Sequence, residues 1–125
     1  MPAPFKFGKK SLERLSEVHE DLQKVFHEVI KEFDCTVLCG YRGEAEQNEA
    51  YATGKSKLKF PKSRHNKKPA EAVDVAPYPV DWRKISEFKL LAAHVQTAAN
   101  KVGVEIEWGG DWVTFRDYPH FQLKR

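Results

Sequence analysis

Residues 63–78 read SRHNKKPAEAVDVAPY and contain the feature on which the rest of the sequence depends. The part AEAVDVAPY (70–78) is an apolar, strand-like run that stops at Pro77 and Pro79, because proline cannot donate a hydrogen bond within a sheet. Asp74 interrupts this run. A buried carboxylate costs several kcal/mol or more unless it is paired or binds a metal, so Asp74 requires a basic partner or a metal ion.

Helical and strand-like segments flank this run on both sides. The predicted helices are residues 11–33, whose beginning is also compatible with a separate short helix, residues 44–54 and residues 85–102. The predicted strands are TVLCG (36–40), AEAVDVAPY (70–78), VEIEWGG (104–110) and PHFQL (119–123). Gly54 and Gly103 are plausible helix ends, and residues 55–68 form a basic loop. This order predicts an α+β fold with helices packed against a small antiparallel sheet.

Length and composition indicate one globular domain, residues 1–125. A chain of 125 residues can bury a core without disulfides or a structural metal. A hydrophobic content of 41% beside a charged content of 31% is typical of an ordinary soluble protein. The net charge of +3 favours anionic partners such as nucleic acid, a cell wall or a membrane surface, without showing that any of them is bound.

The two cysteines and the N-terminal sequence indicate the cellular compartment. Cys35 and Cys39 lie four residues apart on a predicted strand, which places them on one side about 13 Å apart. This is too far for a disulfide, so we expect both thiols to be reduced and buried, as in a reducing compartment. The N-terminal MPAPFKFGKK lacks the apolar core of a signal peptide, and no segment approaches transmembrane length. We therefore expect a cytoplasmic protein without stable membrane association.

The five histidines fall into two groups. His19, His27 and His94 lie in the helical segments, where surface or interface positions are the better interpretation. His65 follows the basic loop just before the strand that contains the interrupting aspartate, and His120 opens the last strand. These two histidines are the candidates for chemistry.

A set of His65, Asp74 and His120 has the ligand types of a zinc site and leaves a fourth position for water, as catalytic zinc sites do. The alternative is a buried ion pair of Asp74 with a histidine or an arginine, and spacing alone leaves the two interpretations even. A zinc hydrolase also needs a general base and a group that stabilises the oxyanion. Asp117 and Arg42 are the candidates, with a turn residue and a surface arginine as the respective alternatives.

Three ordered motifs, GYRGEAEQNEAY, SRHNKKPAEAVDVAPY and DYPHFQL, resemble the zinc peptidases of the D-alanyl-D-alanine carboxypeptidase family. The resemblance runs from FKFGKKSLERL through HFQLKR and is strongest to the branch of phage endolysins that are L-alanyl-D-glutamate peptidases. It implies the zinc D-Ala-D-Ala carboxypeptidase-like (hedgehog-type) fold. The roles that it implies are zinc ligands for His65, Asp74 and His120, general base for Asp117, and substrate binding with transition-state stabilisation for Arg42.

Two further residues match family stretches. Ser63 begins the Ser-x-His pattern and either orients a ligand, touches the substrate or is a simple loop serine. Trp112 lies in WGGDWVTF, which resembles a family stretch near the site, and together with Trp108 it either lines a substrate cleft or fills the core. The basic loop (55–68) has the sign to attract anionic wall polymers or substrate carboxylates, with a solvated loop as the equal alternative.

The resemblance implies hydrolysis of the stem peptide of bacterial peptidoglycan, with the L-Ala–D-Glu bond favoured. The protein would be a monomeric, zinc-dependent phage endolysin that waits in the host cytoplasm until a holin opens the membrane. A D-Ala-D-Ala carboxypeptidase or dipeptidase and a catalytically silent wall-binding module remain as alternatives. Nucleic-acid binding ranks last, because charges are mixed along both long helices instead of clustered on one basic face.

Overall fold

The computed structural model describes residues 4–124 of the chain. The helices are α1 (Lys9–Leu15), α2 (Glu20–Val29), α3 (Glu44–Ala52) and α4 (Ile85–Val102). The strands are β1 (Cys35–Cys39), β2 (Ala72–Pro77), β3 (Ile106–Trp108) and β4 (His120–Leu123). Two 3₁₀ turns, η1 (Arg64–Asn66) and η2 (Gly109–Asp111), complete the elements of residues 4–124.

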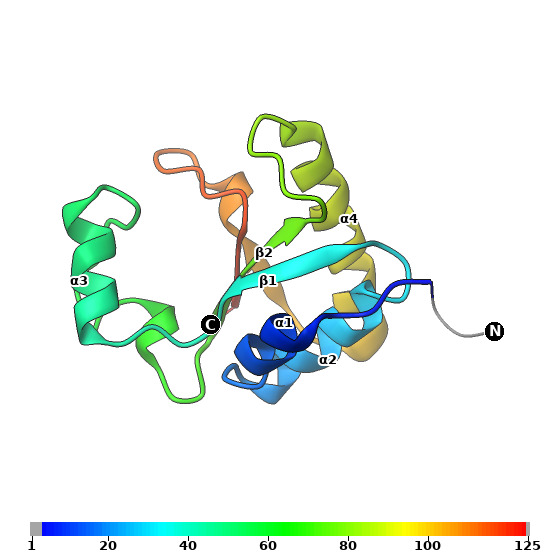
Figure 1. Ribbon diagram of the computed structural model, residues 1–125, viewed down its shortest axis with the longest axis horizontal. Helices are drawn as coiled ribbons and strands as arrows, with labels where there is room; N and C mark the ends of the chain where they lie inside the picture. Colours follow the sequence, from blue (N-terminus) through cyan, green and yellow to red (C-terminus); the bar gives the residue numbers. More distant parts are fainter. Residues whose placement is uncertain (1–3, 125) are drawn as a thin grey trace.

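The strands form one antiparallel sheet in the order β1-β2-β4-β3. Helices α1, α2 and α4 gather around this sheet, whereas α3 stands apart on the opposite side of the molecule from α4 (Figure 1). The α+β fold class predicted from the sequence is confirmed. None of the helices within residues 4–124 is long and apolar enough to cross a membrane.

The segment predicted as one helix over residues 11–33 forms two helices, α1 and α2. The alternative of a separate short helix at its beginning is therefore correct. The helix is interrupted between α1 and α2. There the imidazole Nδ1 of His19 accepts a hydrogen bond from the Asp21 backbone N–H at the start of α2. Such a contact satisfies one of the unpaired amides at a helix start. The ends of the other helices are as expected, since Gly54 and Gly103 adopt positive φ angles of 81° and 76° beyond α3 and α4.

The core lies between the sheet and the amphipathic faces of α2 and α4. Phe26 of α2 meets Phe121 of β4 edge to face, with ring centroids 5.5 Å apart. Leu91 and Val95 of α4 pack in the same cluster. Burying each such side chain stabilises the fold by about 1.5–3 kcal/mol.

Strand β2 presents two different faces. Its valines, Val73 and Val75, join the core, and Asp74 between them points to the other face, because side chains alternate along a strand. Since β2 lies between β1 and β4, the backbone of Asp74 has a neighbouring strand on each side. The fold therefore places this carboxylate at the centre of the sheet, on the side away from the core.

Both cysteines are free, as expected. Cys35 is buried, but Cys39 is only half-buried, so the prediction that both would be buried is wrong for Cys39. The reason is a shift of register between β1 and β2 after Val37, which interrupts the regular alternation on which the prediction rested.

Candidate active site

A cluster of two histidines and one aspartate lies on the outer face of β2 and β4. Asp74 and His120 are directly opposite each other in the antiparallel pair, so their side chains leave the sheet on the same face. Turn η1 adds His65. Nε2 of His65 lies 3.2 Å from Oδ1 of Asp74, and Nδ1 of His120 lies 3.3 Å from the same oxygen. One ligand atom from each residue lies within 4.8 Å of the others, so the three can hold a metal ion.

The far nitrogen of each imidazole is also occupied. Nδ1 of His65 donates to the carbonyl oxygen of Gly40 at 2.8 Å, and Nε2 of His120 donates to Oε1 of Gln122 at 2.8 Å. Every ring nitrogen in the cluster therefore faces an oxygen, whereas a neutral imidazole has only one N–H. Either a second proton or a cation must lie between the rings and Asp74. Metal-binding histidines are commonly held in this way through the nitrogen that is not a ligand, so the donor set fits a metal ion.

The electrostatics of the cluster follow from this geometry. Burial opposes the charge on Asp74, but His65 and His120 outweigh it and hold the pKa of Asp74 well below its usual range. Burial likewise opposes a positive charge on His65, and the Asp74 carboxylate outweighs it, raising the pKa of that imidazole. The cluster thus favours an ionised Asp74 carboxylate next to positively charged groups.

Arg42 reaches the same carboxylate from the loop after β1. Its Nη2 donates to Oδ2 of Asp74 at 3.3 Å, and its Nη1 donates to Oε1 of Gln47 at 3.0 Å. The ion-pair alternative is therefore present in the structure together with the potential metal site. Asp74 has both histidines on one oxygen and the guanidinium on the other, which explains why a carboxylate is tolerated in this strand.

Asp117 lies at the edge of the cluster, in the turn before β4. Its Oδ2 is 3.9 Å from Nδ1 of His120. The Asp117 N–H donates to the carbonyl of Gly109 at 3.0 Å, and this hydrogen bond holds the turn. The two backbones approach so closely that a Cβ at Gly109 would lie only 2.4 Å from the carbonyl oxygen of Asp117, so this position requires glycine. Burial, and then the charge of Asp74, raise the pKa of Asp117 above its usual value. A carboxylate with a raised pKa is suited to taking and returning a proton.

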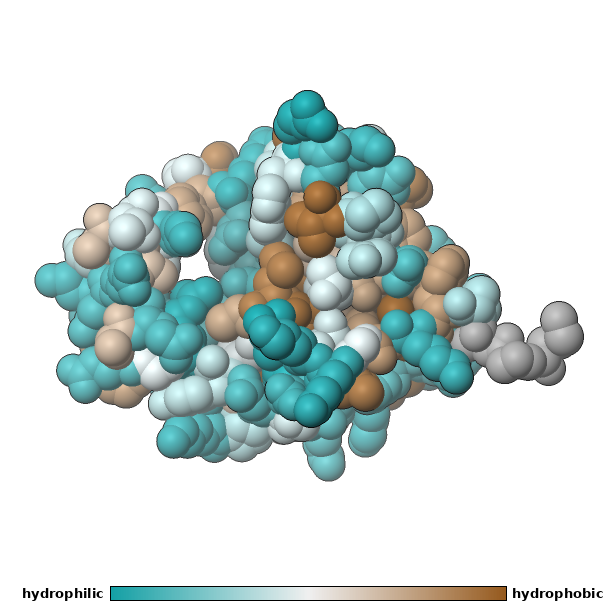
Figure 2. All heavy atoms as spheres, viewed as in Figure 1, coloured by the Kyte–Doolittle hydropathy of each residue, from teal (hydrophilic) through white to brown (hydrophobic). Residues whose placement is uncertain are grey.

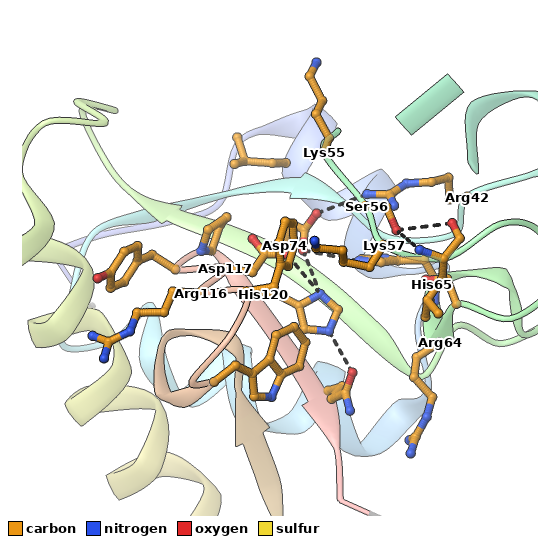
Figure 3. A pocket seen from close by; sticks show the side chains of 18 of the residues that line it. Arg42, Lys55, Ser56, Lys57, Arg64, His65, Asp74, Arg116, Asp117 and His120 are labelled. Atoms are coloured by element: carbon orange, nitrogen blue, oxygen red, sulfur yellow. Dashed lines mark hydrogen bonds and ion pairs between the residues drawn. The ribbon is translucent and has the colours of Figure 1, made fainter. Parts of the chain in front are cut away.

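These residues lie in a pocket of about 790 Å³. Figure 2 shows the surface hollowed between the side of the molecule that carries α3 and the remainder. The loop between β3 and β4, orange to red in Figure 1, stands between α3 and α4 and forms one side of the pocket. The residues that Figure 3 labels around the pocket are Arg42, Lys55, Ser56, Lys57, Arg64, His65, Asp74, Arg116, Asp117 and His120.

Ser63 and Trp112 both lie at the pocket, in different ways. The hydroxyl of Ser63 accepts a hydrogen bond from the His65 backbone N–H at 3.2 Å, so Ser63 begins η1 and orients a member of the cluster. The ring of Trp112 lies 5.0 Å from the ring of His120, and its Nε1 donates to Oε2 of Glu107 at 2.6 Å. Trp112 therefore forms a wall of the pocket beside the cluster.

Trp108 has the other role that the sequence left open, that of a core residue. It packs against the core and stacks on Phe121. The three helical histidines do not line the pocket. His19 caps α2, His27 meets Phe7 edge to face, and His94 packs on the ring of Phe33, which agrees with the structural interpretation of all three.

Sequence reasoning missed the residues that support the cluster. Gln47 is fully buried, accepts from Arg42 and donates to the carbonyl of Leu58 at 2.6 Å. No pattern in the largely polar α3 indicated this burial. Gln122 was also missed, although the sequence carried a signal for it, because it lies two residues after His120 on a strand and therefore shares its face.

A largely buried His-Asp-His cluster that lines a pocket, with a further carboxylate beside it, is typical of the class of metal-dependent hydrolases. The particular family follows from comparison with known proteins. The chain belongs to the family of phage L-alanyl-D-glutamate peptidases, which it matches over residues 3–123.

Two relatives agree with this assignment. The L-alanyl-D-glutamate peptidase of Escherichia phage T5 is 35% identical over 127 residues, covering 97% of this chain and 90% of the relative. The crystal structure of the Serratia marcescens L-Ala D-Glu endopeptidase ChiX superposes with a TM-score of 0.83 at 34% identity, covering 97% of this chain and 92% of that one. Neither name is that of a D-Ala-D-Ala carboxypeptidase.

Proposed function

We propose that this protein is a zinc-dependent endopeptidase that hydrolyses the L-Ala–D-Glu bond in the stem peptide of bacterial peptidoglycan and acts as a phage endolysin. The observation that carries the proposal is the convergence of His65, Asp74 and His120 with Asp117 at the floor of one pocket. The choice of bond is supported by membership of the family and by the names of the phage T5 and Serratia relatives.

The choice of zinc is supported by the donor set. Two imidazole nitrogens and one carboxylate oxygen are ligands that zinc accepts, and three protein ligands leave room for water or substrate. The hydrogen bonds from His65 to Gly40 and from His120 to Gln122 hold both rings in orientation, as is usual around zinc-binding histidines.

When bound, the zinc ion would lower the pKa of the attacking water and polarise the scissile carbonyl. Asp117 would accept the proton of that water; this role is supported by its position beside the cluster, without an arginine or lysine ion-pair partner of its own in residues 4–124. As the water oxygen bonds to the alanyl carbonyl carbon and the C–N bond breaks, Asp117 returns the proton to the D-Glu nitrogen. A raised pKa makes the carboxyl of Asp117 a better carrier of this proton.

Arg42 is suited to bind the developing oxyanion. A guanidinium has five N–H donors, of which its bonds to Asp74 and Gln47 use two. The remaining donors are available to a substrate oxygen, and the two bonds that are made hold the side chain in place. Such fixed donors stabilise the charge that forms in the transition state.

For the setting of the reaction, we propose that a monomer acts on the cell wall from inside the host, after a holin-type protein has permeabilised the membrane. The family, which is one of phage peptidases, supports this setting. Trp112 and Ser63 would contribute to the substrate site, Trp112 as a wall and Ser63 by orienting His65.

Digestion of purified peptidoglycan tests the proposal. We expect new N-terminal D-Glu, detected by labelling of free amino groups and mass spectrometry of the fragments. Release of D-Ala instead would identify a carboxypeptidase. The absence of any new terminus, from protein that binds the wall, would identify a silent binding module.

A further inference from the structure

Three basic side chains line the pocket and have no carboxylate partner in the part of the chain that the structure describes. They are Lys55, Lys57 and Arg116. In Figure 3, Lys55 and Arg116 extend away from Asp74, whereas Lys57 extends toward it. Lys57 is therefore the cation among the three that faces the reaction centre.

One contact across the pocket shows the direction in which Lys57 points. Its Nζ lies 5.4 Å from the centroid of the Phe115 ring, so the side chain spans the pocket from the loop after α3 to the loop before β4. Phe115 and Asp117 belong to the same loop before β4, so the amine reaches the loop that carries the proposed base.

The backbone next to Lys57 is held at several points. Nε2 of Gln47 donates to the carbonyl of Leu58 at 2.6 Å, and the Leu58 N–H donates to Oγ of Ser56 at 3.1 Å. The buried Gln47 also accepts from Arg42. Lys57 thus emerges from a segment that is tied to the reaction centre, although its own side chain is exposed.

The chemistry of the substrate indicates what this amine would meet, and this step rests on the proposed function. Glutamate has one amino group and two carboxyl groups, and the peptide continues through only one of the carboxyls. The other is a free carboxylate unless it is amidated. Asp117 would protonate the D-Glu nitrogen, so the glutamyl residue lies on the Asp117 side, where the carboxylate of Asp117 would repel a free substrate carboxylate unless a cation stands nearby.

We propose that Lys57 is a specificity-determining residue that binds the free carboxylate of the D-glutamyl residue on the leaving-group side of the scissile bond. The enzyme consequently favours stem peptides in which this carboxylate is not amidated.

Two synthetic stem peptides that differ only in this group, free carboxylate against carboxamide, test the proposal. Wild-type protein should cleave the carboxylate peptide with a kcat/KM about tenfold higher, the modest factor expected of a charged hydrogen bond at an exposed site. In Lys57→Met the two peptides should be cleaved within twofold of each other, and in Lys57→Glu the amide should be preferred. Raising the ionic strength should reduce the preference of the wild type.

Lys59→Met is the matched control. Lys59 belongs to the same loop and also covers an aromatic ring, with its Nζ 5.1 Å from the Tyr51 centroid, but it does not line the pocket. This variant should keep the wild-type preference.

The outcomes separate the two proposals. If Lys57→Met and Lys57→Glu cleave the L-Ala–D-Glu bond with the same preference as wild type, the role of Lys57 is wrong and the proposed function stands. Equal cleavage of both peptides by the wild type also overturns the role of Lys57 alone. If the wild type cleaves neither peptide nor purified wall, the proposed function fails and the role of Lys57 fails with it.

Discussion

Substitution of Gly109 by alanine should disable the reaction centre without removing any functional group from it. The added Cβ would lie 2.4 Å from the carbonyl oxygen of Asp117, about 1 Å closer than the 3.4 Å at which ordinary contact begins, and 3.1 Å from Cβ of His120. The first neighbour is backbone, so the turn that carries Asp117 must shift by a comparable distance.

A displacement of about 1 Å at a catalytic group costs roughly 100-fold in rate. We therefore expect kcat/KM for wall digestion by Gly109→Ala to fall by about two orders of magnitude. Overpacking should also lower the free energy of unfolding by about 1–3 kcal/mol. Release of new N-terminal D-Glu measures the rate, and urea denaturation followed by fluorescence measures the stability.

Gly8→Ala is the control, because a Cβ at Gly8 would meet nothing within 4 Å. It should digest the wall at the wild-type rate. If Gly109→Ala is folded and digests the wall within twofold of wild type, then the position of Asp117 does not depend on this glycine, or Asp117 is not the base, and the reasoning is wrong.

Three further predictions concern the support of the metal site, the thiols and the core. Gln122→Leu removes the acceptor of His120 Nε2 and should weaken metal affinity about 10- to 100-fold in a competition titration, whereas unchanged affinity would show that this contact is dispensable. Burial raises the pKa of Cys35 to about 12, so at pH 8 it stays protonated and a thiol reagent should modify the half-buried Cys39 first; equal rates in the folded protein would contradict this. Phe26→Ala should lower the free energy of unfolding by about 3–5 kcal/mol in urea, since the ring is fully buried against Phe121, and a loss below 1 kcal/mol would contradict the assigned core.

The parts of the fold with local signals could be predicted from the sequence. Helix α4 follows from its apolar spacing and from Gly103, whose positive φ ends it. Strand β2 follows from the apolar run that stops at prolines. Residue types alone left a metal site of His65, Asp74 and His120 and a buried ion pair as even alternatives, and the resemblance favoured the metal site, because residues 9 and 46 positions apart carry no local signal of contact.

The remaining features depend on tertiary structure. Gln47 is buried although α3 is largely polar, because the loop that follows α3 folds back over it and provides acceptors. The half-exposure of Cys39 results from a register shift that its own neighbours do not encode. Lys57 is one basic residue among several in its loop, and only the pocket distinguishes it from Lys59.

The proposed function requires that the His-Asp-His cluster binds a catalytic zinc ion and that Asp117 is the base. Zinc content and peptidoglycan digestion, measured together for the wild type and for Asp117→Ala, test it most directly. We predict about one zinc per chain in both proteins, with new N-terminal D-Glu produced by the wild type alone. Digestion by a wild type that holds no divalent metal, or equal digestion by Asp117→Ala, would contradict the claim.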